Sequence, residues 1–574
     1  MSLDTKLKIF LQLLQRFPEN IRSIIITCIL GLTAALSTVC FLYLTNLLFS
    51  KTYLLFATKS VPFFIVASFL VITATSLLVG FLLNVFSPEA AGSGIPQVKT
   101  AYWKELGYMK LTPVLVKFIA GVLSIGGGNS LGREGPSVNL GSGVASNLHG
   151  ILGASSRQRR SATLIGASAG LAAAFNTPIA AITFVIEEIV GDLNNRYLGS
   201  VVLSSVIGAF VVYAILGRHP AFSLPSTENI SWLHYVVVPV VAIVAAFAGI
   251  VFQRSTIFWR GRLKNQTKIP GWLLPVCGGL ITWLIGCSIF WMTGKVGVFG
   301  LGYQDLSSAL NNNFEWKIAG VLVCAKLCAT VASYSFGGCG GIFAPSLFIG
   351  GMSGYFIGGL ADILIPLTGA DRIVLAAVGM SSCLGAIVRA PFTSMLIVFE
   401  MTHQFTLVPA LLISTIISQT IAFRVGKVNF YDALLIQDGH ELYKIRPPVD
   451  LYGWQNLPVC AIANPNLVGI TSLNEKEMRE IINKYPYNTF PVVSGNEIKG
   501  IVTRQEIQNA LLYGRHPEMH SAATCYSDQT IKEVGNKFVD SAVPALIVLE
   551  RDTNTIKGII TLHDLIRAQS SVQK

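Results

Sequence analysis

The sequence predicts a polytopic α-helical membrane protein with a duplicated transport domain, followed by a cytoplasmic α/β domain. Of its 574 residues, 52% are hydrophobic and 13% are charged, whereas soluble proteins carry about a quarter charged residues. The last 134 residues hold 14 of the 42 basic and 14 of the 30 acidic side chains, so the whole net charge of +12 falls in the first 440. Two short motifs also recur within that first part. An ordinary soluble enzyme is therefore excluded.

Apolar stretches of roughly 20 residues, long enough to cross a bilayer, occur at 24–48, 61–85, 198–216, 235–252, 273–291 and 407–423. Further apolar stretches, interrupted by Gly and Pro, cover 111–128, 162–189, 318–365 and 373–400. Broken helices are tolerated in a membrane only where they are buried in protein or line a wet cavity, so a solute pathway is indicated. Close helix packing explains many of these glycines, but not the charged residues beside them.

The basic excess fits the positive-inside rule, and it also favours the approach of anions. Residues 1–23 predict an amphipathic N-terminal helix on the cytoplasmic membrane surface, with apolar positions at Leu7, Phe10, Leu11 and Leu14. No cleavable signal peptide is recognised. The ten Cys contain no C-x-x-C and the His are scattered, so neither a metal site nor a redox motif is predicted.

The membrane part repeats itself. Gly132-Arg-Glu-Gly-Pro-Ser137 and Gly341-Ile-Phe-Ala-Pro-Ser346 share the pattern G-x-x-x-P-S at an offset of 209. Pro178 precedes Glu187 by nine residues, as Pro391 precedes Glu400, at an offset of 213. Landmarks in the same order at nearly equal offsets indicate two homologous halves, with a binding site at their interface. The spacing leaves open whether the repeat is parallel or inverted.

Three Gly-rich turns lie where helices are expected to begin: Gly92-Ser-Gly-Ile-Pro96, Gly132-Arg-Glu-Gly-Pro136 and Gly338-Cys-Gly-Gly-Ile-Phe-Ala-Pro345. Such a turn directs free backbone N–H groups and the positive end of the helix dipole at one place, which favours an anion. The turns hold too few carboxylates for a divalent-cation site.

These three segments, in this order, resemble the signature segments of the CLC chloride channel and transporter family over residues 24–437. The resemblance implies a homodimer with one anion pathway per subunit, built from inverted repeats of tilted, partly broken helices. It also implies that the Ser93 hydroxyl, the backbone amides of Ile342 and Phe343, and the Tyr431 hydroxyl coordinate the anion. Ser93 as a helix cap and Tyr431 as an interfacial aromatic are the alternatives.

The resemblance assigns Glu134 as the gating glutamate, a carboxylate that occupies an anion site when ionised and leaves it when protonated. The alternative is that Glu134 only complements the partial positive charge of a helix N-terminus. Glu188 is the candidate internal proton acceptor, because the second Glu of a Val-Ile-Glu-Glu-like segment relays protons in exchangers of this family. The neighbouring Glu187 is expected to be structural, since adjacent residues on a helix point about 100° apart. A water-exposed helix end is the alternative for this pair.

The tail also repeats. Lys499-Gly-Ile-Val-Thr503 and Lys557-Gly-Ile-Ile-Thr561 each follow a strand-like run and precede a helical pattern, at an offset of 58. A linker over 438–456 is predicted to lead to a tandem CBS pair, with motif 1 over 457–515 and motif 2 over 516–574. The resemblance to CBS pairs implies a possible regulatory adenine nucleotide at Thr503, Thr561 and Asp564. Glu506 stands where Asp is usual, and a purely structural dimerisation module is the alternative.

The sequence thus predicts chloride/proton exchange in a multi-pass membrane protein, without enzymatic activity, cofactor, metal or nucleic-acid partner. The partners expected are chloride, protons, the lipid bilayer and a second copy of the chain. A prokaryotic plasma membrane with the CBS pair in the cytoplasm is favoured. A passive chloride channel on the same fold is the first alternative, and a non-transporting membrane nucleotide sensor is a remote one. A CBS-bearing magnesium transporter is disfavoured by the anion-type turns.

Overall fold

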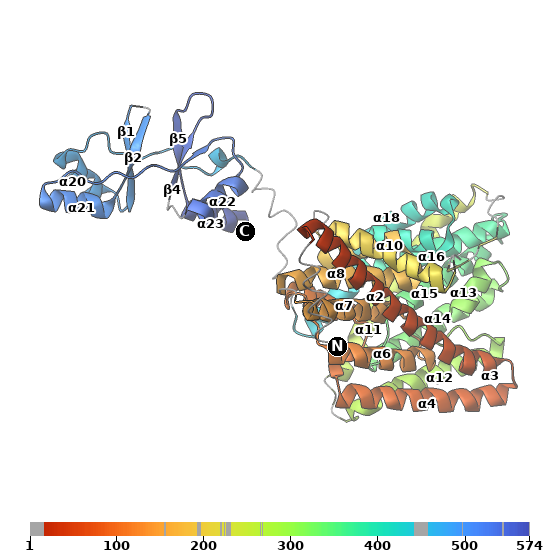
Figure 1. Ribbon diagram of the computed structural model, residues 1–574. Helices are drawn as coiled ribbons and strands as arrows, with labels where there is room; N and C mark the ends of the chain where they lie inside the picture. Colours follow the sequence, from red (N-terminus) through yellow and green to blue (C-terminus); the bar gives the residue numbers. More distant parts are fainter. Residues whose placement is uncertain are drawn as a thin grey trace. The chain divides into compact units, whose positions relative to one another are not determined.

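The computed structural model describes residues 17–153, 156–191, 197–217, 221–222, 224–225, 231–264, 266, 268–426, 428–440, 457–495, 497–541 and 545–572. The chain divides into two compact units, Met1–Ile445, which we call the membrane unit, and Arg446–Lys574, which we call the soluble unit. Both are drawn in Figure 1. The predicted amphipathic helix falls largely on residues 1–16, and most of the predicted linker falls on 441–456; both segments lie outside the described residues.

The first half of the membrane unit is a series of helices of unequal length. Its elements are α2 (Glu19–Phe49), η1 (Ser50–Leu54), α3 (Leu55–Ala57), α4 (Val61–Val85), η2 (Pro88–Ala90), α5 (Ile95–Trp103), α6 (Leu111–Gly126), α7 (Glu134–Ile151), α8 (Ser156–Phe175), α9 (Pro178–Phe184), η3 (Val185–Val190) and α10 (Leu198–Ile215). The break after α8 and the π-helical η3 lie inside the interrupted stretch predicted at 162–189.

The second half follows the same order. Its elements are α11 (His234–Lys264), η4 (Gly271–Leu273), α12 (Leu274–Thr293), α13 (Tyr303–Leu310), α14 (Trp316–Ser335), α15 (Phe343–Ala361), α16 (Gly369–Val388), α17 (Pro391–Thr402), η5 (Phe405–Leu407), α18 (Val408–Val425) and α19 (Phe430–Gln437). The opening helices α2 and α11 each contain 31 residues. Nine helices within the described residues are long and apolar enough to span a membrane, as a multi-pass protein requires.

The two halves meet at a reciprocal pair of backbone hydrogen bonds. Gly132 N donates to Gly341 O at 2.7 Å, and Gly341 N donates to Gly132 O at 2.6 Å. These residues are the equivalent first glycines of the two G-x-x-x-P-S motifs, and they pair in antiparallel fashion. A mutual antiparallel pair of bonds between equivalent residues is what a local two-fold axis between the halves produces. The pair places the N-termini of α7 and α15 next to each other.

A second reciprocal contact links the halves through carboxylates. Glu187 accepts hydrogen bonds from the amides of Phe392 and Thr393, at 3.1 and 2.8 Å. Glu400 accepts hydrogen bonds from the equivalent amides of Ile179 and Ala180, at 3.0 and 2.7 Å. Each carboxylate thereby satisfies the unpaired first amides of a helix in the other half. The expectation that Glu187 is structural agrees with this geometry.

The soluble unit holds a two-stranded and a three-stranded sheet, each packed with helices (Figure 1). In the described residues, β1 (Thr489–Ser494) pairs with β2 (Glu497–Thr503) in antiparallel fashion. Likewise, β4 (Ala545–Leu549) pairs antiparallel with β5 (Ile556–Thr561) and parallel with β3 (Thr524–Tyr526). The helices are η8 (Val459–Ala461), α20 (Glu475–Lys484), α21 (Arg504–Tyr513), α22 (Ile531–Ser541) and α23 (Leu562–Val572).

In the soluble unit, a segment of each sequence repeat forms hydrogen bonds with a strand of the other repeat. Asn464 forms reciprocal backbone hydrogen bonds with Ile559 of β5, at 2.9 and 3.0 Å, and His520 does so with Ile501 of β2, both at 2.9 Å. Val459 packs in the core of the second half, beside Cys525 and Val548. Each half is therefore completed by chain from the other sequence repeat, which makes the pair one folding unit.

The crossed carboxylates predict matched stability effects. Replacing either Glu187 or Glu400 with Gln keeps the size but removes the charge that faces two helix amides, so each change is expected to cost about 1–2 kcal/mol of stability. Thermal unfolding of the purified protein in detergent measures this cost. Glu315→Gln, an exposed position at the start of α14, is the control. A loss in one variant without a comparable loss in the other would contradict the equivalence of the two contacts.

Candidate functional site

Ser93 lies in the loop that begins α5, and its hydroxyl is buried. Gly94 adopts φ +95°, a left-handed conformation open to Gly, and a Cβ on it would lie 2.7 Å from the Cβ of Asn139. The Asn139 amide donates to Gly94 O at 3.1 Å and fixes the turn. The Ser93 side chain is 1% exposed, so water does not satisfy it from the surface.

Tyr431, in the first turn of α19, lies near Ser93. Within the described residues, neither hydroxyl makes a hydrogen bond of normal geometry, although the two are close enough to interact. The Tyr431 ring is completely buried and stacks on Phe343, with ring centroids 6.5 Å apart. Buried hydroxyls without partners cost free energy, so two of them beside a helix N-terminus indicate a place for an acceptor such as an anion.

The N-terminus of α15 faces the same region. Ile342 is its N-cap and Phe343 its first residue, and the first amides of a helix have no partner within the helix. These amides and the dipole of α15 favour negative charge at this point. The fold therefore brings together Ser93, Tyr431, Ile342 and Phe343, which the sequence drew from three distant segments.

The carboxylate of Glu134 already occupies a position at the N-terminus of α15. Glu134 is the first residue of α7 and is fully buried. Its Oε2 accepts a hydrogen bond from Ala344 N at 3.3 Å, and its Oε1 accepts one from the Tyr303 hydroxyl at 3.2 Å. A Cβ on Gly132 would collide with this carboxylate. Glu134 thus stands where a free anion would be stabilised by the same donors.

Tyr303 is a site residue that the sequence analysis missed. It begins α13 directly after Gly302, whose φ of +78° matches the left-handed Gly94 before α5. The internal repeat was the available signal, because α5 and α13 hold the same place in the two halves. Arg133 lies over the Tyr303 ring, 5.7 Å from its centroid, and contacts Asn46.

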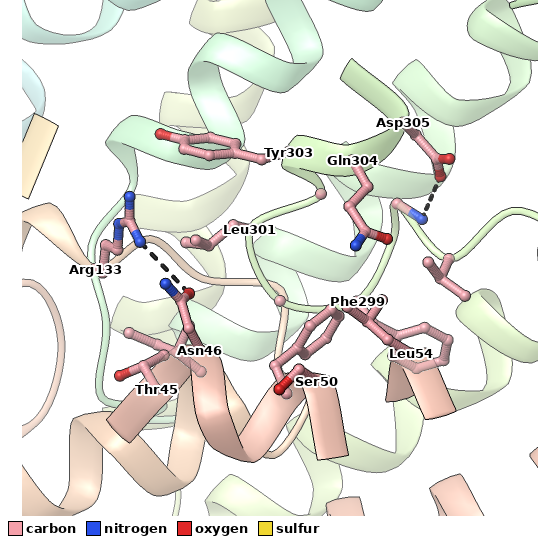
Figure 2. A pocket seen from close by; sticks show the side chains of 16 residues that line it. Thr45, Asn46, Ser50, Leu54, Arg133, Phe299, Leu301, Tyr303, Gln304 and Asp305 are labelled. Atoms are coloured by element: carbon pink, nitrogen blue, oxygen red, sulfur yellow. Dashed lines mark hydrogen bonds between the residues drawn. The ribbon is translucent and has the colours of Figure 1, made fainter. Parts of the chain in front are cut away.

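A pocket of about 330 Å³ opens beside Glu134. Figure 2 shows Tyr303 and Arg133 on one wall, with Asn46 and Ser50 of the α2–η1 region opposite. Arg133 and Tyr303, which line this pocket, also adjoin the Glu134 carboxylate, so the pocket extends to the residues next to Glu134. The positive charge of Arg133 on the pocket wall favours the approach of anions.

Glu188 lies in η3 and is 2% exposed, which rules out a water-exposed helix end. Its Oε1 lies 2.6 Å from the Nζ of the buried Lys99, and its Oε2 accepts a hydrogen bond from the Asn429 amide at 3.0 Å. Lys99 also reaches Asp432 Oδ1 at 2.6 Å. The sequence analysis found Glu188 but not these partners, since the ion pairs join residues up to 333 positions apart.

In the soluble unit, Thr503, Thr561 and Asp564 take part in local helix caps. Asp564 Oδ2 accepts hydrogen bonds from the amide and hydroxyl of Thr561, at 2.8 and 2.7 Å. Thr503 forms the equivalent capping box with Glu506, whose other oxygen contacts His520. Although partial burial works the other way, the hydrogen bonds from His520 and Thr503 lower the pKa of Glu506, and the same contact raises the pKa of His520. Glu506 is thus an engaged carboxylate.

No group of three or more His, Cys, Asp or Glu side chains in the described part of the chain could hold a metal ion. The arrangement of the membrane unit instead suits anion binding. Its donors are neutral hydroxyls, backbone amides and helix ends, with one carboxylate able to take the anion's place.

Gly135→Ala tests this arrangement, because a Cβ at position 135 would collide with the Ser93 hydroxyl. We expect the displaced loop to weaken chloride binding at least fivefold, about 1 kcal/mol, as measured by calorimetric titration of the purified protein. Gly199→Ala, where no heavy atom lies within 4 Å of the added Cβ, is the matched control. Equal affinities in the two variants would remove Ser93 from the proposed anion site.

Comparison with known proteins places this geometry in a family. Residues 75–422 match the family described as voltage gated chloride channel, and residues 519–571 match the CBS domain. The H(+)/Cl(-) exchange transporter ClcA of Vibrio campbellii is 30% identical over 374 residues, which are 64% of this chain and 79% of the relative. The protein of the same name from Salmonella agona is 31% identical over 380 residues, 64% and 77% of the two chains. These relatives are transporters rather than enzymes.

Solved structures agree on the fold. A slow cyanobacterial Cl−/H+ antiporter superposes with a TM-score of 0.65 at 23% identity, over 72% of this chain and 97% of its own. A eukaryotic CLC transporter superposes with a TM-score of 0.58 at 20% identity, over 95% and 98%. With the family match over more than half of the chain, the inverted halves and the anion-type helix ends, the protein belongs to the CLC family of voltage gated chloride channels and transporters and carries a C-terminal CBS domain.

Proposed function

We propose that the protein exchanges chloride for protons across a membrane. The observation that carries the proposal is the position of Glu134, whose carboxylate is held by the Ala344 amide at the N-terminus of α15. Ser93, Tyr431 and Phe343 lie on the adjoining side. Chloride and the ionised Glu134 carboxylate therefore compete for the same position at the N-terminus of α15. The relatives' names, H(+)/Cl(-) exchange transporters, support the same reaction.

In this mechanism Glu134 acts as the gating glutamate. While ionised, it fills the anion position and blocks the path. A proton taken up from the pocket lined by Arg133 and Tyr303 neutralises it, which removes its attraction to the α15 N-terminus. The neutral side chain then leaves, and chloride enters the vacated position. When chloride moves on, the proton departs to the other side and the carboxylate returns, so that the two ions move in opposite directions.

Glu188 is proposed as the internal proton acceptor. It is buried, yet its partner Lys99 joins it to Asp432, whose side chain is 33% exposed. The second candidate function is a passive chloride channel gated by Glu134. The ion pair with Lys99 favours that alternative if it makes Glu188 a fixed structural charge. A non-transporting nucleotide sensor is disfavoured by the unpartnered Ser93 and Tyr431 hydroxyls.

The cellular arrangement is also part of the proposal. We place the protein in a prokaryotic plasma membrane as a homodimer, with the soluble unit in the cytoplasm. Support comes from the bacterial relatives and from the basic excess of the membrane unit, which the positive-inside rule assigns to cytoplasmic loops. No cofactor takes part in the proposed exchange.

Glu134→Gln tests the gate. The neutral amide cannot carry a proton, so we expect proton movement to fall at least tenfold while some chloride flux remains. Purified protein in liposomes with an imposed chloride gradient, with external pH and chloride both recorded, measures this. Glu315→Gln on the surface is the control. Proton movement equal to that of the unchanged protein would exclude Glu134 as the gate.

We further propose a regulatory adenine nucleotide at the CBS pair, bound chiefly through Thr561 and Asp564. Support comes from the match to the CBS domain over 519–571, while the Thr503 half is weaker because Glu506 is engaged by His520. Titration of the full-length protein with ATP is expected to detect binding that Asp564→Asn weakens at least tenfold, with the exposed Asp552→Asn as control. Absence of binding to the unchanged protein would make the pair a structural module.

A further inference from the structure

A buried lysine joins the candidate proton acceptor to a second, more accessible carboxylate. Lys99 Nζ lies 2.6 Å from both Glu188 Oε1 and Asp432 Oδ1. We infer that Asp432 is the carboxylate through which protons from the soluble-unit side reach Glu188, with Lys99 as the group that connects them. This inference deepens the proposed exchange and rests on it.

Solvent access distinguishes the two carboxylates. The side chains of Lys99 and Glu188 are 0% and 2% exposed, whereas that of Asp432 is 33% exposed. A proton from water therefore meets Asp432 first. Two carboxylates contact one lysine, so these three side chains together carry a net charge of −1 when all are ionised, and one carboxylate can accept a proton while Lys99 keeps the other as its ion-pair partner.

The position of Asp432 in the fold gives the direction of access. It lies in the first turn of α19, an eight-residue helix about 12 Å long. The chain then leads through residues 441–456 to the soluble unit, which we propose to be cytoplasmic. Asp432 is thus within one short helix of the point where the chain leaves the membrane unit on that side.

The first turn of α19 also fixes the geometry of the cluster. The Asn429 side chain accepts a hydrogen bond from Asp432 N at 2.8 Å, and its amide donates to Glu188 Oε2 at 3.0 Å. One residue caps the helix and orients the acceptor. Tyr431 lies between Asn429 and Asp432 in the sequence and belongs to the proposed anion site. The proposed chloride and proton pathways therefore share a single helical turn.

Other charged residues lie on or beside the elements that contact α19. Arg389, the C-cap of α16, interacts electrostatically with Asp432. On α11, Arg260 and Lys264 are engaged with Asp438, each at 2.9 Å, and Lys104 after α5 contacts His440 at 3.4 Å.

The proton transfer from Asp432 to Glu188 needs only the three side chains of the cluster. A proton first binds Asp432. Lys99 then passes a proton to Glu188 Oε1 as it takes the proton from Asp432 Oδ1, so the lysine ends with the charge it had at the start. Both movements follow existing contacts of 2.6 Å, and no further reactant is needed. The net result is one proton moved from Asp432 to Glu188.

Asp432→Asn tests the relay in liposomes that report chloride and proton flux together. We expect proton flux to fall at least tenfold while chloride flux stays within threefold, as expected for Glu188→Gln. Asp432→Glu is expected to restore at least half of the proton flux, because it returns an ionisable group. Asp438→Asn, a carboxylate at the other end of the same helix with a similarly exposed side chain, is the matched control and is expected to keep both fluxes.

Failure of the Asp432 relay can be distinguished from failure of the proposed exchange. Chloride flux without proton movement in the unchanged protein would overturn the proposed exchange itself. If the unchanged protein couples the ions and Asp432→Asn couples them equally well, the relay is overturned and exchange stands. Loss of both fluxes in Asp432→Asn, or equal loss of proton flux in Asp438→Asn, would show that the carboxylate only holds α19 in place, and would also overturn the relay.

Discussion

The membrane unit depends on the reciprocal hydrogen bonds between Gly132 and Gly341. They close the gap between two inverted halves at the point where the helices α7 and α15 begin. A side chain at either glycine would prevent this approach, since a Cβ on Gly341 would lie 2.9 Å from Gly135 N. Because helix N-termini carry partial positive charge, bringing two of them together inside an apolar protein creates a demand for an anion. Glu134 meets that demand in the structure described here.

The same symmetry explains two buried lysines, Lys117 and Lys326, for which the described part of the chain offers no carboxylate within salt-bridge distance. Lys117 donates to Ala91 O and Gly92 O, at 3.4 and 3.1 Å, and holds the loop that presents Ser93. Lys326, 209 positions later, donates to Gly297 O, Val298 O and Gly300 O, at 3.0, 3.1 and 2.7 Å. That loop presents Tyr303 to Glu134. Each half thus uses one ammonium ion to satisfy the carbonyls of an irregular loop at membrane depth, where water is not available.

Much of this could be predicted from the sequence. Apolar length located the spanning helices, and repeated G-x-x-x-P-S motifs located the residues that meet at the centre. Tyr303, Lys326 and the partners of Glu188 could not be found in this way, because single residues in apolar surroundings form no local pattern. The correspondence between α5 and α13 offered a route to Tyr303, because Gly300-Leu-Gly302 before α13 repeats the Gly-x-Gly of Gly92-Ser-Gly94 before α5. The two-fold relation between the halves likewise became apparent only from the antiparallel pairing of Gly132 with Gly341.

The helix α19 has two contacts that make coupling physically plausible. Its first turn carries Tyr431, which adjoins Ser93 and Phe343, and is capped by Asn429, which holds Glu188. A displacement of this turn cannot alter the anion site without altering the surroundings of the proton acceptor. Because these contacts all lie on one turn, the proposed anion-binding residues and the proposed proton-carrying residues need no direct contact to influence one another.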